Sequence, residues 1–161
     1  MSDKQTVILV IYGAGGHKTE MQRLVSQLTV SNPVALVSLG SGVLNNPALA
    51  HYQAYDVRDK HSRLRSLLKL FPAVLKTLFD VLTISRRYKV AGVLSTGPGL
   101  CILPMLLFRV VGVKTVFLET FCRFESRSFT GRIMYRIAHR FLIQNRELQS
   151  LYPNAEYSGR L

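Results

Sequence analysis

The chain has 161 residues, a length that suits one domain with a buried core, and 48% of its residues are hydrophobic, which excludes a disordered protein. Its formal charge of +12, from 21 lysines and arginines against 9 acidic residues, points to anionic partners such as diphosphates or an anionic membrane surface. Aromatic residues do not alternate with the basic clusters as a base-stacking surface requires, so we expect no nucleic-acid partner.

The first predicted strand covers residues 6–12 and is followed by a glycine-rich turn, Gly13-Ala14-Gly15-Gly16-His17-Lys18-Thr19, and then by an amphipathic helix. Glycines let the backbone approach an anion closely, and the N-terminus of the following helix favours negative charge. The turn therefore predicts a phosphate site with a histidine beside it. A turn whose glycines serve only packing is the alternative, but packing alone does not require an imidazole there.

Two familiar phosphate motifs do not fit this turn. A P-loop requires glycine at the positions of His17 and Tyr12. A dinucleotide fingerprint requires a small residue in place of Lys18 and an acidic residue about 20 positions later, whereas no acidic residue lies between Glu20 and Asp56. Both departures weaken the hypothesis of an ATPase or of an NAD-dependent oxidoreductase.

Further apolar strands are predicted at residues 34–38, 91–95, 114–118 and 141–144, with helical patterns between most of them. Apolar strands that alternate with helices indicate a parallel sheet covered on both faces. We expect residues 1–161 to form a single α/β domain of Rossmann-like fold, with its ligands at the carboxyl ends of the strands.

A basic amphipathic helical region is predicted at about residues 62–89. Within it, residues 64–82 carry a broad apolar stripe at helical spacing, surrounded by lysines and arginines. Such a face can enter the interfacial layer of an anionic membrane, and the residues predicted to contact it are Leu67, Leu68, Lys69, Phe71, Leu75, Lys76 and Phe79. The alternative is a core-facing pair of helices broken at Pro72.

Two other segments end predicted strands at the same edge of the sheet as the glycine turn. The first is Ser95-Thr96-Gly97-Pro98-Gly99, whose backbone donors could face an anion or could simply connect a strand to a helix. The second is Glu119-Thr120-Phe121-Cys122-Arg123. A carboxylate after an apolar strand is costly unless it is solvated, paired or used, and pairing of Glu119 with Arg123 or Arg127 is the alternative to a functional role.

The cysteines and the apolar runs indicate whether the protein is exported or spans a membrane. Cys101 and Cys122 lie beside apolar sequence and lack the spacing of metal ligands, so we expect neither a disulfide framework nor a metal. The N-terminal apolar run is too short for a secretory signal, and no uncharged run reaches the roughly 18 residues of a spanning helix. We expect a protein that is not exported and does not cross a membrane by itself.

Four segments in order resemble the acceptor-side subunit of two-component GT-B glycosyltransferases. This group includes the bacterial exopolysaccharide proteins of PssD type and the anchoring subunit of the eukaryotic enzyme that adds the second N-acetylglucosamine to dolichol diphosphate. The resemblance covers nearly the whole chain, and the first three segments are also similar to loops in the N-terminal domain of MurG. The segments are Gly13 to Met21, Ser95 to Gly99, Glu119 to Arg123, and Tyr152 to Gly159 with Leu161.

The resemblance implies a site and a substrate. The first two loops would bind the diphosphate of a polyprenyl-linked acceptor, and His17 or Glu119 would be the catalytic base. The residues implied to bind the acceptor diphosphate are Gly13, Gly15, Gly16, Lys18, Thr19, Ser95, Thr96, Gly97, Gly99 and Arg123. The chain departs from the eukaryotic subunit in two respects: it has no N-terminal transmembrane helix, and it has Thr120 where serine is frequent.

The resemblance also implies a partner. A GT-B enzyme needs two Rossmann-like domains, so the UDP-sugar would be bound by a separate small subunit, and no cofactor is implied. The residues implied to contact that subunit are Tyr157, Ser158, Gly159, Arg160 and Leu161, although Leu161 could instead close the domain's own core. The location implied is peripheral, on the cytoplasmic face of the inner or plasma membrane.

The implied reaction is inverting transfer from a UDP-sugar to a lipid-linked saccharide in polysaccharide or oligosaccharide biosynthesis, without a metal. His17 suits the base because a helix N-terminus disfavours the imidazolium. Two alternatives remain: a non-catalytic membrane scaffold that recruits a glycosyltransferase, and a stand-alone nucleotide- or phosphate-binding enzyme.

Overall fold

The protein is described by a computed structural model that covers residues 4–31, 34–54 and 63–161, and their side chains except those of residues 30, 31 and 63–70. The elements in chain order are β1 (Thr6–Tyr12), α1 (Gly16–Ser31), β2 (Leu36–Gly40), β3 (Ala50–Gln53), α2 (Arg63–Arg87), β4 (Lys89–Ser95), η1 (Gly99–Cys101), α3 (Ile102–Val110), β5 (Lys114–Leu118), α4 (Phe129–Ile137), β6 (Arg140–Ile143), η2 (Arg146–Ser150) and β7 (Glu156–Tyr157).

The strands form one sheet of seven parallel strands in the order β3-β2-β1-β4-β5-β6-β7. The predicted α/β fold with a parallel sheet is confirmed, and all five predicted strands are present with ends shifted by one or two residues. The two edge strands were not predicted from the sequence. β3 and β7 have only four and two residues, with polar side chains, so neither produces an apolar run.

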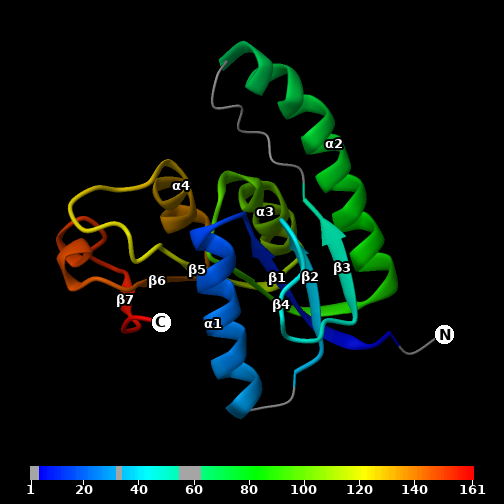
Figure 1. Ribbon diagram of the computed structural model, residues 1–161, viewed down its shortest axis with the longest axis horizontal. Helices are drawn as coiled ribbons and strands as arrows, with labels where there is room; N and C mark the ends of the chain where they lie inside the picture. Colours follow the sequence, from blue (N-terminus) through cyan, green and yellow to red (C-terminus); the bar gives the residue numbers. More distant parts are fainter. Residues whose placement is uncertain (1–3, 32–33, 55–62) are drawn as a thin grey trace.

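Helices cover both faces of the sheet (Figure 1). On one face, α1 packs through Met21 and Val25 against Val10 and Tyr12 of β1. On the other face, α2, α3 and α4 bury a larger core. The side chains of a strand alternate between faces, so β1 contributes to both cores, which explains its nearly continuous apolar sequence.

The region predicted at residues 62–89 is one continuous helix, α2, with Pro72 inside it. The predicted helix pair broken at Pro72 is therefore wrong. Proline removes one backbone donor, and that loss is compensated here because α2 packs along the sheet through Ala73, Val81 and Ile84, all buried.

The strand order places the candidate site. The chain runs from β1 outward to β2 and β3, and then crosses to β4 on the other side of β1, so the direction of winding reverses between β1 and β4. In open α/β sheets, ligands bind at the carboxyl ends of the strands where this reversal occurs. The glycine turn follows β1 and the segment from Ser95 to Gly99 follows β4, so the two predicted phosphate loops lie next to each other.

Candidate functional site

The loops after β1 and β4 are joined by two hydrogen bonds. His17 lies in the first turn of α1, and its Nδ1 is 2.6 Å from the carbonyl oxygen of Thr96. The Thr96 hydroxyl donates to the carbonyl of His17 at 2.9 Å. A carbonyl oxygen can only accept, so the proton of the neutral imidazole is on Nδ1 and the lone pair is on Nε2. The contact therefore prepares His17 to accept a proton at Nε2.

The glycines of the two loops have different roles. A Cβ on Gly13 would lie 2.6 Å from Pro98, and one on Gly97 would lie 2.9 Å from the His17 ring, so these two glycines allow the loops to pack together. Gly15 has a φ of 64°, which requires glycine. A Cβ on Gly16 would meet nothing within 4 Å, so packing does not explain that glycine. The packing alternative thus accounts for Gly13 and Gly97 but not for Gly16.

The open space at Gly16 adjoins backbone donors. The amides of Lys18 and Thr19 already donate to the Gly15 carbonyl, at 3.0 and 3.1 Å. Among the described residues, no carbonyl outside α1 accepts from the amides of Gly16 or His17. The first amides of a helix have no acceptor within the helix, so these two donors are free for an anion.

Three predicted phosphate-binding side chains, those of Ser95, Thr96 and Arg123, have structural partners instead. Ser95 is fully buried and its hydroxyl accepts from the Gly97 amide at 3.1 Å. Thr96 is buried and holds His17. The Arg123 guanidinium donates to Ser126, and the Lys18 ammonium lies near Gly42 beyond β2. Of the predicted set, Gly15, Gly16, Thr19, Gly99 and Arg123 are exposed.

A buried carboxylate that was not predicted as a site residue, Glu20, joins the glycine turn to the loop after β5. Glu20 is 1% exposed. Its Oε1 accepts from the Thr120 hydroxyl at 2.8 Å and from the Phe121 amide at 2.9 Å. Its Oε2 has no hydrogen-bond partner among the described residues and lies 3.8 Å from Nδ1 of His17. One carboxylate therefore fixes the third loop and places negative charge beside the histidine.

Glu119 is enclosed and not ion-paired. It is 2% exposed, and its oxygens accept from the hydroxyls of Ser128 and Tyr152, at 3.0 and 3.1 Å, and from the Thr120 amide at 3.2 Å. Ser128 is also the N-cap of α4. Within the described residues, Glu119 forms no ion pair with Arg123 or Arg127, so that alternative is wrong. Arg123 donates to Ser126, and Arg127 lies over the Tyr152 ring and donates to the Leu151 carbonyl.

Burial raises the pKa of the Glu119 carboxyl above its ordinary value of 4.5, and the hydrogen bond from Ser128 offsets part of this rise. A carboxyl with a higher pKa in the folded state binds its proton more tightly when folded. Its contribution to stability is therefore complete below the unfolded pKa and is lost as the pH rises through the folded pKa.

This shift gives a pH-dependent prediction. We expect the free energy of unfolding of the wild type to fall, relative to that of Glu119→Gln, as the pH rises above 4.5. Urea titrations of both proteins at a series of pH values measure the difference. A difference that does not change with pH would show that Glu119 ionises as readily in the folded chain as in the unfolded one.

The C-terminal segment predicted as the partner interface reaches the same end of the sheet. Arg160 donates to Oδ1 of Asn145 at 2.8 and 3.0 Å, and the Leu161 amide donates to Oε1 of Gln144 at 3.1 Å. Gln144 in turn donates to the Glu119 carbonyl at 3.1 Å and, at 3.4 Å, to Glu20. Tyr157, Ser158 and Arg160 are exposed, whereas Leu161 is half-buried.

The apolar stripe of α2 is exposed. Phe71, Leu75 and Phe79 are 69%, 51% and 67% exposed, and Val74 and Leu82 lie on the same side of the helix. Lys76 forms an ion pair with Asp80 at 2.5 Å. The side chains of the predicted contact residues Leu67, Leu68 and Lys69 lie outside the described residues. In the part of the chain that the structure describes, no helix has the length and apolarity needed to span a membrane.

Sequence signals for the missed residues existed but were incomplete. Glu20 lies three positions after His17, on the same side of a helix, which is the one local signal of their proximity. Gln144 and Asn145 form a polar pair directly after an apolar strand. Their partners lie up to 124 residues away along the chain, and no local pattern identifies them.

Comparisons with known proteins identify chains that are similar to this one. A family model described as "Oligosaccharide biosynthesis protein Alg14 like" matches residues 49–161. Human UDP-N-acetylglucosamine transferase subunit ALG14 is 29% identical over 178 residues, covering 96% of this chain and 82% of the human protein. The subunit of the same name from Schizosaccharomyces pombe is 30% identical over 174 residues, covering 96% and 83%.

The crystal structure of MurG from Acinetobacter baumannii has the same fold over 86% of this chain, with a TM-score of 0.59 and 18% sequence identity. The chain corresponds to 41% of the MurG chain. The likeness confirms the expected similarity to one half of a GT-B protein, and at this identity it concerns the fold alone.

Proposed function

Because the chain belongs to the family of Alg14-like oligosaccharide biosynthesis proteins, we propose that it is the acceptor-side subunit of a UDP-sugar-dependent, inverting glycosyltransferase. The two relatives described above are named as transferase subunits, which supports an enzyme assembled from more than one chain. The proposed acceptor is a saccharide linked to a polyprenyl diphosphate, and the proposed partner is a small subunit that binds the UDP-sugar.

The observation that carries the proposal is the contact between the loops after β1 and β4, at the point where the winding of the sheet reverses. Free backbone donors at Gly16 and His17 adjoin open space and suit a diphosphate. His17 is beside them, with its Nε2 lone pair available. A diphosphate on these amides would place the attached sugar within reach of a base.

We assign the base to His17. In the proposed reaction the acceptor hydroxyl oxygen forms a bond to the anomeric carbon, the bond to UDP breaks, and the hydroxyl proton passes to Nε2 of His17. Glu119 is enclosed by hydrogen-bond donors, so its proposed role is to hold the third loop against α4. No metal is required if backbone dipoles and the partner subunit stabilise the departing diphosphate.

Glu20 supports this assignment as a positioning residue. A carboxylate 3.8 Å from Nδ1 stabilises the imidazolium that forms when His17 accepts the proton. We expect Glu20→Gln to lower kcat about tenfold, equivalent to roughly 1.4 kcal/mol of transition-state stabilisation, with little change in KM.

Comparing kcat with KM separates this role from a purely structural one. Loss of the charge beside Nδ1 should lower kcat while the KM for the acceptor stays close to that of the wild type. The control is Glu147→Gln, which removes an exposed carboxylate on η2. A rise in KM that accounts for the whole loss of kcat/KM would limit Glu20 to holding the loops.

The α2 surface supports peripheral attachment to an anionic membrane. Exposed phenylalanines in one stripe, on a chain with a net charge of +12, favour insertion at a lipid interface over solvation. In our proposal this surface holds the subunit on the cytoplasmic face of the membrane, where lipid-linked acceptors are presented.

Membrane attachment gives a direct prediction. We expect Phe71→Ser/Phe79→Ser to weaken binding to vesicles of phosphatidylcholine and phosphatidylglycerol at least about tenfold, because burial of each phenylalanine contributes roughly 1.5–3 kcal/mol. Co-sedimentation measures the binding. Val43→Ser is the control, since Val43 is 62% exposed but lies after β2, away from α2. Equal binding by both variants would exclude α2 as the contact surface.

The proposed function is tested by measuring the activity of the chain together with its partner subunit. We would co-express the chain with the donor-binding subunit from the same organism and measure UDP release from a panel of UDP-sugars, with membrane extract that carries polyprenyl-diphosphate acceptors. Acceptor-dependent release that requires both chains is the expected result. Equal activity of this chain alone would contradict the two-subunit proposal, and an intact complex that is inactive with every donor would favour the scaffold.

The placement within the bacterial exopolysaccharide type remains a prediction, which the preferred donor sugar tests.

A further inference from the structure

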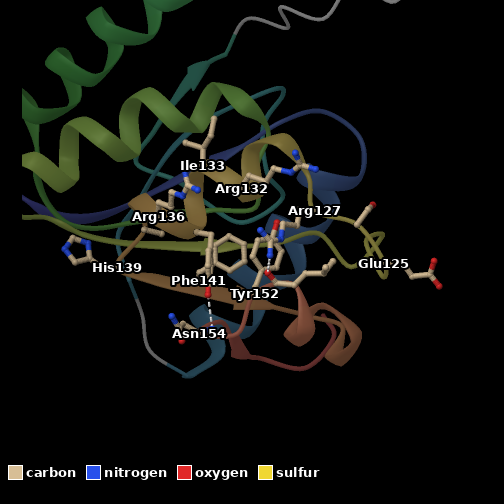
Figure 2. Close-up of a pocket in the computed structure, with 13 residues that line it drawn as sticks. Glu125, Arg127, Arg132, Ile133, Arg136, His139, Phe141, Tyr152 and Asn154 are labelled. Carbon is tan, nitrogen blue, oxygen red and sulfur yellow. Dashed lines mark hydrogen bonds between the residues drawn. The ribbon is translucent and has the colours of Figure 1, made fainter.

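A pocket of about 1000 Å³ lies next to the third loop, between α4 and the segment that follows η2 (Figure 2). None of the glycine-loop residues lines it. Its walls carry the side chains of Arg127, Arg132, Arg136 and His139, whereas Glu125 is the one acidic residue that lines it. In Figure 2, Glu125 and His139 lie at opposite ends of the pocket.

Two of the arginines are available to a ligand. Arg132 and Arg136 lie one turn apart on α4 and are exposed. Within the described residues, neither guanidinium has a hydrogen-bond or ion-pair partner. Like charges one turn apart destabilise a helix, so an anion between them would relieve their repulsion. Arg127, by contrast, is engaged with the Leu151 carbonyl and the Tyr152 ring.

His139 supplies a neutral donor at one end of the pocket. Its Nδ1 accepts from the Thr115 amide at 3.2 Å, which requires the lone pair on Nδ1 and the proton on Nε2. Partial desolvation, with the nearby charges of Arg109 and Lys114, lowers the pKa of the exposed His139, which favours the neutral ring. The imidazole can therefore donate from Nε2.

The floor of the pocket is aromatic. Phe141 and Tyr152 are buried, with ring centroids 4.7 Å apart, and Tyr135 packs against both. Figure 2 shows these two buried rings beside Arg132 and Arg136. An apolar floor lowers the local dielectric, which strengthens attraction between the guanidinium groups and an anion.

We propose that this pocket binds a phosphate group through Arg132, Arg136 and His139. Guanidinium groups bind phosphate oxygens with two parallel hydrogen bonds, and two such groups one turn apart can share one dianion. The phosphate belongs either to a soluble phosphoanion or to the headgroup of an anionic phospholipid. The proposal does not depend on transferase activity.

The test uses the full chain. Because the glycine loops are also proposed to bind phosphate, binding is measured at the arginines of the pocket themselves. The Nε–Hε NMR signals of Arg132 and Arg136, assigned from the single variants, are followed during titration with inorganic phosphate. In a second arm, co-sedimentation is compared for phosphatidylcholine vesicles with and without phosphatidic acid. The two arms separate a soluble phosphoanion from a lipid headgroup.

We expect at least one probe to bind, and Arg132→Gln/Arg136→Gln to weaken that binding about tenfold or more, since the charge-assisted hydrogen bonds of both guanidinium groups are lost. The control, Lys4→Gln/Lys89→Gln, removes the same charge from two exposed residues at the amino ends of β1 and β4. Equal weakening in both double variants would show a general charge effect and overturn the proposal. Arginine signals that phosphate does not move, together with equal sedimentation on vesicles with and without phosphatidic acid, would also overturn it.

Discussion

Replacing His17 with alanine is expected to lower sugar transfer by the assembled complex by about 10²–10⁴-fold, the range that general base catalysis contributes. The imidazole is fixed by the Thr96 carbonyl and faced by the Glu20 carboxylate, which leaves its Nε2 placed to accept the proton of the acceptor hydroxyl. Glu119 is enclosed by its hydrogen bonds and cannot replace it. UDP release from the identified donor measures the effect.

Complex formation should survive the same change. The His17 side chain is one-third exposed. The hydrogen bonds that hold the C-terminal segment run through Arg23, Gln144 and Asn145, not through the His17 ring. Co-purification of His17→Ala with the donor-binding subunit tests this. The matched control is His51→Gln, on the edge strand β3, which is expected to leave transfer unchanged. Full activity in His17→Ala would remove the histidine from the mechanism, and a complex that stays intact but loses transfer would exclude the scaffold alternative.

The central strands and the convergence of the three loops were predictable because both follow from local patterns. Apolar runs mark strands, and the glycine turn after the first run marks a helix N-terminus. The edge strands gave no such pattern, since a strand of two residues such as Glu156–Tyr157 is stabilised by pairing with β6 and not by its own composition. The sequence therefore predicted the centre of the sheet better than its edges.

Individual roles within the loops were less predictable. Ser95 and Thr96 were expected to bind phosphate. Instead, the Ser95 hydroxyl accepts a hydrogen bond from the Gly97 amide, and the Thr96 hydroxyl donates one to the His17 carbonyl. Buried polar groups generally form such hydrogen bonds within the protein. Glu20 was noted only as the last acidic residue before Asp56, and its contacts with Thr120 and Phe121 depend on tertiary structure. Sequence can thus indicate where a site forms, while hydrogen bonds across the sheet decide which residues are available to a ligand.

In the amphipathic region, too, local sequence predicted the element, while tertiary packing decided the role of individual side chains. Helical spacing predicted the stripe of α2, and the exposure of Phe71 and Phe79 distinguishes a surface stripe from a core-facing one, which spacing alone could not do. Lys76 was grouped with the membrane residues because it is basic and adjoins the stripe. Its ion pair with Asp80, which is 6% exposed, depends on how α2 packs on the sheet.

Gly131→Ala is expected to destabilise the domain by on the order of 2–4 kcal/mol, the combined cost of overpacking and of weakened hydrogen bonds to a buried carboxylate. Gly131 lies in the first turns of α4, where helix propensity alone would make alanine more stable by about 1 kcal/mol. A Cβ there would lie 1.8 Å from Oε2 of Glu119 and 2.6 Å from the Tyr152 hydroxyl. Both groups belong to one hydrogen-bonded cage, so neither can move without breaking it.

Gly16→Ala is the matched control, because Gly16 opens α1 and a Cβ there meets nothing within 4 Å. Urea unfolding should give this variant the stability of the wild type or slightly more, while Gly131→Ala unfolds at lower urea. Equal stability of the two variants would mean that Glu119 can leave its cage at little cost, and the carboxylate would again be a candidate for the base. The loss expected for Gly131→Ala would instead support Glu119 as the anchor of the third loop and leave proton transfer to His17.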